Sequence, residues 1–325
     1  MKTSASLLAL LLAAACLPHG SLQAQSYPAK AVKIIVPVPP GGGTDTMARG
    51  LAQRLASFWN QTVLVENRPG LGAIVGAEAA AKSRGDGYTL LFTEAGPFVI
   101  NPHLYKKLPY NPLTDFAPIT VVVRLTPVLA VGDSVPARNV KELIAYAKAH
   151  PGDLTYGSFG SGSYPHIVME QFKKMAGVDI LHVPFKGSVG AITEIVGGRL
   201  SMMLATISVF AQQEKAGRLR ILAAATDTRL QLRPDLPTIA ESGLPGFFVS
   251  VWFGLVAPAS TPPNILDRIN ADVVKVVKSA EFHENFLKPQ LVEAVGNSRE
   301  EFAAQLKAEL ATWGKLVADS GAKAE

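Results

Sequence analysis

The sequence is nearly free of cysteine, and the one that it has, Cys16, lies in an N-terminal segment unlike the rest of the chain. There Lys2 precedes an apolar run over Leu7–Leu17, and a small residue, Ala24, closes a possible cleavage site. This pattern predicts a secretory signal peptide over residues 1–24, and its apolar run is too short for a permanent membrane anchor. Cleavage after Ala24 would leave a mature chain without a thiol, which suits an oxidising compartment and excludes stabilisation by disulfides.

Cys16 leaves a second processing route open. In a lipoprotein signal, cleavage would follow Ala13-Ala14-Ala15, and Cys16 would become the lipidated first residue of the mature chain. Either route exports the protein, and we take cleavage after Ala24 as the main expectation.

Basic runs, metal-ligand spacing and further long apolar stretches are missing as well. The formal net charge is only +5 and no basic run is present, so nucleic acid is not implied as a partner. No stretch beyond the N-terminal segment reaches the roughly 18 apolar residues of a membrane helix. The six histidines are scattered, and we expect no metal site. With 48% hydrophobic residues, the chain instead has the composition of a globular protein.

Short β-branched runs alternate with helical patterns after the N-terminal segment, which predicts an α/β fold. A length of 325 residues favours two domains over one. Pro127 separates the runs Ile119–Val123 and Val128–Val131, where we expect the first passage between domains, and Val251–Val256 reads as the return strand. The expected domains are residues 25–124 with 250–325 (domain 1) and residues 125–249 (domain 2).

Helix patterns with start signals occur at several points. Thr44–Phe58 has apolar residues at steps of three and four, and Thr44 or Asp45 is expected to cap its first turn. Asn139 and Ser298 each precede a glutamate at capping-box spacing and predict two further helix starts. The predicted buried face of the first helix is Met47, Leu51, Leu55 and Phe58.

The stretch Pro39–Asp45 contains three consecutive glycines between a predicted strand, Val32–Val36, and that helix. Glycine lets main-chain N–H groups approach a ligand, and a helix start leaves N–H donors unpaired at the positive end of the helix dipole. A plain strand-to-helix turn is the alternative, but it does not require three glycines. We therefore predict an anion site, and the missing Gly-Lys-Ser/Thr sequence excludes a Walker phosphate loop.

Gly70, Gly72 and Gly76 resemble part of a dinucleotide-binding fingerprint. The motif is incomplete and lacks a clear ribose-binding acid about twenty residues later. Close packing of a helix on the sheet is the favoured interpretation.

A second glycine-serine loop, Ser158–His166, precedes another predicted helix. Ser161 and His166 are close in sequence, so a serine hydrolase stays open as an alternative, although the nucleophile-elbow motif and a declared carboxylate are missing. Ligand contact or helix capping is favoured. Lys186, after the strand ending at Pro184, either faces the ligand or is solvated.

Both loops follow strands, and ligands of α/β sheets bind outside the carboxyl ends of strands. Two domains that each present such a loop would form a cleft that closes on a small anion. The same residues match a known family in order along the chain. The matching segments are Tyr27-Pro28, Ile35-Val36-Pro37, Pro39–Asp45, Val65–Gly70, Asp86–Leu90, Ile100–Pro102, Leu104–Tyr110, Asp115–Pro118, His182–Gly187, Met202-Met203, Leu236–Thr238 and Trp252–Gly254.

On these residues the chain resembles the substrate-binding proteins of tripartite tricarboxylate transporters, the Bug family of periplasmic receptors. The resemblance implies a two-domain, type II-like periplasmic-binding-protein fold that closes as a flytrap, without catalysis or cofactor. It also implies a small organic carboxylate as ligand, the large and small membrane subunits of the transporter as partners, and a monomer. The candidate ligand-binding residues are Val38, Gly41, Gly42, Gly43, Thr44, Asp45, Thr93, Glu94, Gly160, Ser161, Gly162, Ser163, Tyr164, His166, Lys186 and Ala205.

Three positions depart from the family pattern. Val38 replaces an aromatic residue, commonly Phe, and Ala205-Thr206 stands where an Asp is common. Glu94 occupies a loop position where small or hydroxyl residues are usual. If Glu94 faces the cleft, it would repel a second carboxylate and favour a ligand with a hydroxyl group or a nitrogen. The ligand itself is not determined by the sequence, and a ligand sensor for a signalling partner remains an alternative to a transport receptor.

Overall fold

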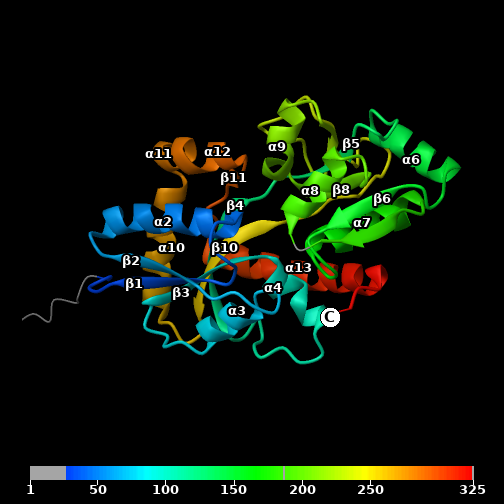
Figure 1. Cartoon of the computed structure of the whole chain (residues 1–325). Coiled ribbons are helices and arrows are strands. Elements are labelled where there is room, and N and C mark those ends of the chain that lie inside the picture. Colours follow the sequence, from blue (N-terminus) through cyan, green and yellow to red (C-terminus); the bar gives the residue numbers. More distant parts are fainter. Residues whose placement is uncertain (1–26, 186, 324–325) are drawn as a thin grey trace, which may run out of the picture.

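Two mixed β-sheets organise the chain (Figure 1). The computed structural model describes residues 27–185 and 187–323. The predicted signal peptide, with Cys16, and the predicted site residue Lys186 lie outside the described residues.

The six-stranded sheet and the helices around it form the larger lobe. Its strand order is β11-β4-β10-β3-β1-β2, in which β1, β2 and β3 are parallel and β10 is antiparallel to β3 and β4. The strands are β1 Val32–Val36, β2 Val63–Asn67, β3 Thr89–Glu94, β4 Phe116–Arg124, β10 Trp252–Pro258 and β11 Glu293–Ala294. The helices are α2 Gly43–Trp59, α3 Ile74–Ala81, α4 Gly96–Val99, α5 Asn101–Leu104, α10 Pro263–Val277, α11 Ala280–Phe282, the π-helix η2 His283–Leu287, α12 Lys288–Gln290 and α13 Arg299–Ser320.

The five-stranded sheet and its helices form the smaller lobe. Its strand order is β7-β6-β8-β5-β9, with β6 parallel to β7 and β8, and β5 antiparallel to β8 and β9. The strands are β5 Pro127–Gly132, β6 Thr155–Ser158, β7 Leu181–Pro184, β8 Met202–Thr206 and β9 Leu219–Ala224. The helices are α6 Val140–Ala149, α7 Tyr164–Ala176, α8 Ser188–Val196 and α9 Ile207–Lys215.

The carboxyl edges of the two sheets meet where the chain crosses between the lobes. β4 ends at Arg124 and β5 begins at Pro127, so only two residues separate the sheets at this crossing. Pro127 lies opposite Thr206, the carboxyl end of β8, and on the other side of the crossing Arg124 lies opposite the first residue of β10. β10 returns at this same edge and must therefore run against β3 and β4. The Leu125 N–H donates to the carbonyl of Val251 (2.8 Å) and holds the two crossings side by side.

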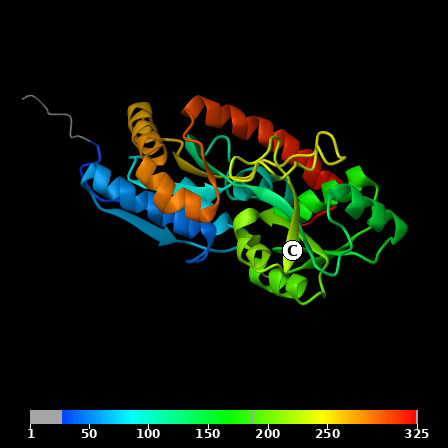
Figure 2. The ribbon, with the colours of Figure 1, turned by 90° about the horizontal axis from the view of Figure 1, so that it is seen from above.

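Helix α13 extends beyond its own lobe. It packs on β4 and α4 of the larger lobe and on α7 of the smaller lobe (Figure 2). Its capping box at Ser298 is as predicted, and its buried stripe consists of Phe302, Leu306, Trp313 and Val317. The Lys174 ammonium pairs with Asp319 at 2.9 Å near the end of this contact. One apolar cluster accordingly continues from the larger lobe onto one face of the smaller sheet.

The first helix, α2, differs from its prediction at both ends. Its N-cap residue is Gly42, which has no side chain to cap the helix, and Thr44 and Asp45 lie inside the first turn. The expected cap by Thr44 or Asp45 is therefore wrong. Phe58 was predicted to be buried but is 41% exposed, because Trp59 continues the four-residue step from Leu55 and takes the buried position. The Trp59 indole N–H donates to Asp272 at 2.7 Å.

Gly76, in α3, lies directly against the end of β1. A Cβ at this position would be 2.7 Å from the Pro37 Cα and 2.8 Å from the Arg68 carbonyl oxygen. These are main-chain atoms that cannot move aside cheaply. The interpretation of this glycine as a packing residue is confirmed.

We expect Gly76→Ala to lower the free energy of unfolding by about 1–3 kcal/mol, the usual cost of overpacking. The measurement is urea unfolding followed by circular dichroism. Gly96→Ala is the control, because a Cβ there meets nothing within 4 Å. Equal effects of the two substitutions would contradict the packing role of Gly76.

Candidate functional site

The loop between β1 and α2 leaves main-chain N–H groups unpaired at the helix start. Gly41 has a φ of +89°, which disfavours any other residue, and Gly41–Gly43 are exposed. The N–H groups of Gly43, Thr44 and Asp45 open α2, and no acceptor among the described residues takes them. The predicted set of donors for an anion is therefore available at this helix start.

The Asp45 side chain holds this loop in shape. Its carboxylate is almost fully buried and accepts hydrogen bonds from the Gly41 N–H (2.9 Å), the Arg49 guanidinium (2.9 Å) and the Asn67 amide (2.8 Å). Burial alone would raise the pKa of Asp45, but these hydrogen bonds outweigh it and lower the pKa. The carboxylate is thus ionised and committed to protein partners, while the main chain it supports stays free.

The second loop, between β6 and α7, is held by turns and by a histidine. Gly160 and Gly162 have φ values of +119° and +79°, and the Ser163 hydroxyl donates to the Gly160 carbonyl at 2.7 Å. The Gly162 N–H donates to Nδ1 of His166 at 3.0 Å. Ser161 is exposed at the tip. His166, in the first turn of α7, therefore supports the loop through this hydrogen bond.

His166 belongs to a stack of rings that sequence reasoning missed. Its ring lies 4.0 Å from that of His182 with an interplanar angle of 5°, and Tyr156 stacks on the other face of His182 at 4.8 Å. Nε2 of His182 is 2.7 Å from the Ser158 hydroxyl. Burial lowers the pKa of His166, and it lowers that of His182 to about 4 with a further contribution from His166. Both rings are neutral at neutral pH, so Nδ1 of His166 can accept a hydrogen bond.

The geometry does not favour the hydrolase alternative. The serine-histidine pair that forms is Ser158 with His182, and Ser158 is fully buried. Among the described residues, no carboxylate hydrogen bonds to either imidazole, so the orienting member of a triad is missing there. Ser161 makes no bond to His166 within this part of the chain.

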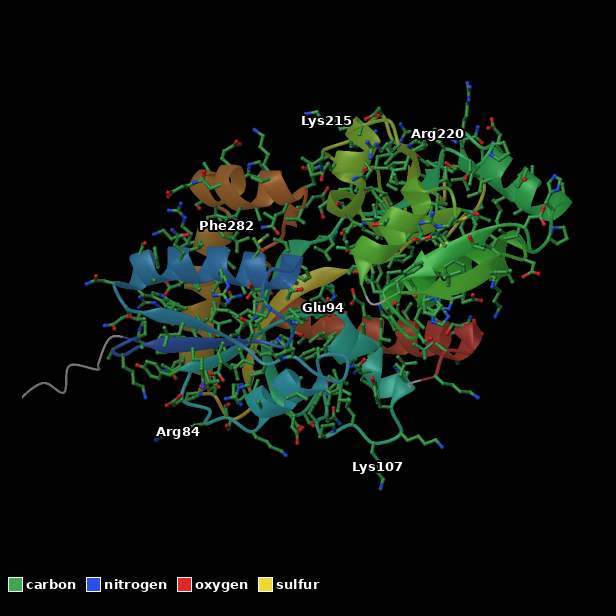
Figure 3. The ribbon with its side chains drawn as sticks, in the orientation of Figure 1. Arg84, Glu94, Lys107, Lys215, Arg220 and Phe282 are labelled. Atoms are coloured by element: carbon green, nitrogen blue, oxygen red, sulfur yellow. The ribbon has the colours of Figure 1, made fainter. Side chains whose placement is uncertain are left out.

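Glu94 and Tyr164 belong to different lobes and lie at their junction. Glu94 ends β3 and lies in the middle of the molecule, where the lobes meet (Figure 3). Its side chain is partly buried, and this burial raises the pKa of its carboxyl group. Burial raises the pKa of Tyr164, at the start of α7, and the nearby Glu94 charge raises it further. Close by, Leu104 of α5 approaches Gly162, where a Cβ would be 2.7 Å from the leucine side chain.

Three other predicted residues are buried or half-buried. Val38 is half-buried and packs on the core of the larger lobe. Thr93 is fully buried, and its hydroxyl donates to the Glu94 carbonyl at 3.1 Å. Ala205 is fully buried in the apolar cluster of the smaller lobe. No group of three or more potential metal ligands occurs in residues 27–185 and 187–323, and no helix there is long and apolar enough to cross a membrane.

Comparisons with known proteins give a consistent result. A family model described as "Tripartite tricarboxylate transporter family receptor" matches residues 47–322. The chain is 33% identical over 303 residues to protein BugT of Bordetella pertussis, which covers 93% of each chain. It is similar to the solved structure of R. palustris Rpa4515 with adipate, at 34% identity and a TM-score of 0.82, covering 91% of this chain and 99% of that one. MatC from Rhodopseudomonas palustris with bound malate matches at 28% identity and a TM-score of 0.77, covering 90% and 100%.

These structures confirm the predicted fold class, the α/β fold of periplasmic solute-binding proteins. The predicted resemblance is confirmed as well.

The histidine stack predicts an acid-sensitive loop. Since the unfolded chain binds protons at these histidines at higher pH than the folded chain, the stability they contribute is complete above a pH of about 6.5. It falls as the pH drops towards about 4, the pKa of folded His182. We expect the melting temperature to decline across this window. The double variant His166→Asn/His182→Gln keeps a hydrogen-bonding group at each site but cannot titrate, so its decline should be smaller; an unchanged slope would contradict the prediction.

Gly162→Ala should cost more stability than its backbone conformation explains. A positive φ costs a residue with a Cβ about 1–2 kcal/mol, and the clash with Leu104 adds about 1–3 kcal/mol. Gly177→Ala is the matched control, because Gly177 also has a positive φ (62°) but meets nothing within 4 Å. Urea unfolding measures both, and Leu104→Ala in the Gly162→Ala background should recover part of the loss. Equal losses at the two glycines would show that the lobes do not touch there in solution.

Proposed function

This chain belongs to the tripartite tricarboxylate transporter receptor family, and on that basis we propose that it is a periplasmic receptor for a small organic carboxylate. It captures the ligand between its two lobes and delivers it to the large and small membrane subunits of a tripartite transporter. The relatives solved with adipate and with malate support a carboxylate as the ligand class. The observation that carries the proposal is the set of unpaired N–H groups at the start of α2.

The ligand carboxylate binds to main-chain donors. N–H groups of Gly43, Thr44 and Asp45 converge at the positive end of the α2 dipole, and the loop over Gly160–Tyr164 supplies the second half of the clamp. Hydrogen bonds to a charged group contribute about 1.5–3 kcal/mol each. Three such bonds contribute about 4.5–9 kcal/mol. Micromolar affinity corresponds to about 8.2 kcal/mol, so apolar contacts with the rest of the ligand supply a further part. Asp45 and His166 act as supports of the two loops.

Binding closes the lobes around the two crossing passages. Domain 1 is residues 25–124 with 250–325, and domain 2 is residues 125–249. Because a carboxylate held by both loops links the lobes, it binds the closed state better than the open state and shifts the equilibrium towards closure. The membrane subunits then recognise the closed surface.

A thermal-shift screen over mono-, di- and tricarboxylates tests the receptor function. A ligand at 100 times its dissociation constant stabilises the folded state by about 2.7 kcal/mol. We expect at least one small carboxylate to raise the melting temperature. Absence of a shift with every carboxylate in the panel would refute the proposed function.

Gly43→Pro tests the anchor within the same screen. Proline removes the N–H at the first helical position, where it is otherwise tolerated, and the preceding Gly42 already has the extended conformation that proline requires (φ −78°, ψ 171°). We expect ligand affinity to fall by roughly 10–100-fold, the value of one charge-assisted hydrogen bond, with the free-state melting temperature preserved. Gly43→Ala keeps the N–H and should bind as the wild type does.

A further inference from the structure

Glu94 is a partly buried carboxyl group without a protein partner among the described residues. In that part of the chain, no donor hydrogen bonds to its side chain and no cation pairs with it. By contrast, the carboxylates of Asp45 and Asp272, which are buried, have arginine, amide or indole partners. Even partial burial of a carboxyl group without a partner is costly, so its position between the lobes needs an explanation.

Tyr164 presents a second unpaired polar group on the opposite lobe. Its hydroxyl oxygen is inaccessible to solvent and has no hydrogen-bond partner in the described part of the chain. The hydroxyl lies towards Thr206 without reaching hydrogen-bond geometry, and the ring is held edge-on by Phe159 at 5.9 Å. The contact of Leu104 with Gly162, two residues before Tyr164, holds the start of α7 against the larger lobe, to which Glu94 belongs. The charge of Glu94 also raises the pKa of the Tyr164 hydroxyl.

We propose that Glu94 and Tyr164 form a second ligand subsite, which takes a hydroxyl or ammonium group at the end of the ligand away from its anchored carboxylate. This inference rests on the proposed function and names its ligand class. A carboxylate accepts hydrogen bonds and attracts a cation, so either donor group would satisfy Glu94. The Tyr164 hydroxyl can accept from the same donor or donate to a ligand hydroxyl. A second ligand carboxylate would instead place two anionic groups together in a region of low dielectric.

The subsite also acts at closure. Glu94 comes from the larger lobe and Tyr164 from the smaller, so a ligand satisfies both groups only when the lobes are together. A ligand that fills the carboxylate anchor alone leaves both groups unpaired in the closed state. Closure therefore selects ligands that carry the donor.

The test compares ligands of equal length that differ at one end. Isothermal titration calorimetry of the mature chain uses adipate, 6-hydroxyhexanoate, 6-aminohexanoate and hexanoate, and the four-carbon series of succinate, 4-hydroxybutyrate, 4-aminobutyrate and butyrate. In the wild type, the hydroxy or amino acid of at least one series should bind at least ten-fold more tightly than the dicarboxylate of that length. The ratio of hydroxy to amino acid then identifies the donor.

Glu94→Gln supplies the matched variant. It removes the charge and keeps the shape, so we expect the ratio of donor-bearing ligand to dicarboxylate to fall at least ten-fold and the ligand-free melting temperature to rise. Tyr164→Phe should weaken the donor-bearing ligand more than the simple monocarboxylate, whereas Tyr146→Phe on α6 should change neither.

A dicarboxylate that binds the wild type as tightly as its hydroxy and amino counterparts would overturn the subsite, as would a preference unaffected by Glu94→Gln. Those results would leave the receptor function standing, because carboxylates would still bind. Failure of every carboxylate to bind would remove the receptor function and the subsite together.

Discussion

The hydrogen bond between the Leu125 N–H and the Val251 carbonyl joins the two crossings, and the rest of the site depends on that arrangement. Because the chain leaves the larger sheet and returns to it at one edge, β10 must run antiparallel to its neighbours. In the smaller sheet, β5 likewise runs antiparallel to its neighbours β8 and β9. The carboxyl edges of both sheets consequently face the junction, and the loops that follow β1, β3, β6 and β8 all reach it.

At this junction side chains fix the loops, and the main chain supplies the free hydrogen-bond donors. Asp45 is fully occupied by Gly41, Arg49 and Asn67, and His166 is occupied by Gly162. These buried groups fix the loops, so the N–H groups at the start of α2 are left without protein acceptors. The loops are therefore ordered before the ligand binds, which reduces the conformational entropy lost on binding.

The sequence was sufficient for strands β1, β4, β5 and β10, for the starts of α6 and α13 and for both glycine loops, because these depend on local periodicity, on capping and on the φ values that glycine alone adopts readily. It did not indicate the short elements α4, α11, α12, η2 and β11, or helix α9. It failed at the end of α2, where Phe58 and Trp59 are both one helical step from the buried face and only packing against Asp272 distinguishes them. The stack of His166 and His182 was also missed, since it depends on the register between β6 and β7. The approach of Tyr164 to Glu94 depends on how two lobes meet, which no local pattern encodes.

An anchor made of main-chain N–H groups is chemically the same whichever side chains surround it. Substitutions along Gly43–Asp45 leave the donors in place unless they introduce proline or disturb the supporting Asp45. Side chains at the other end, such as Glu94 and Tyr164, can change without altering that anchor. The ligand range of this scaffold can therefore diversify through one or two substitutions, while the ability to hold a carboxylate is inherited unchanged.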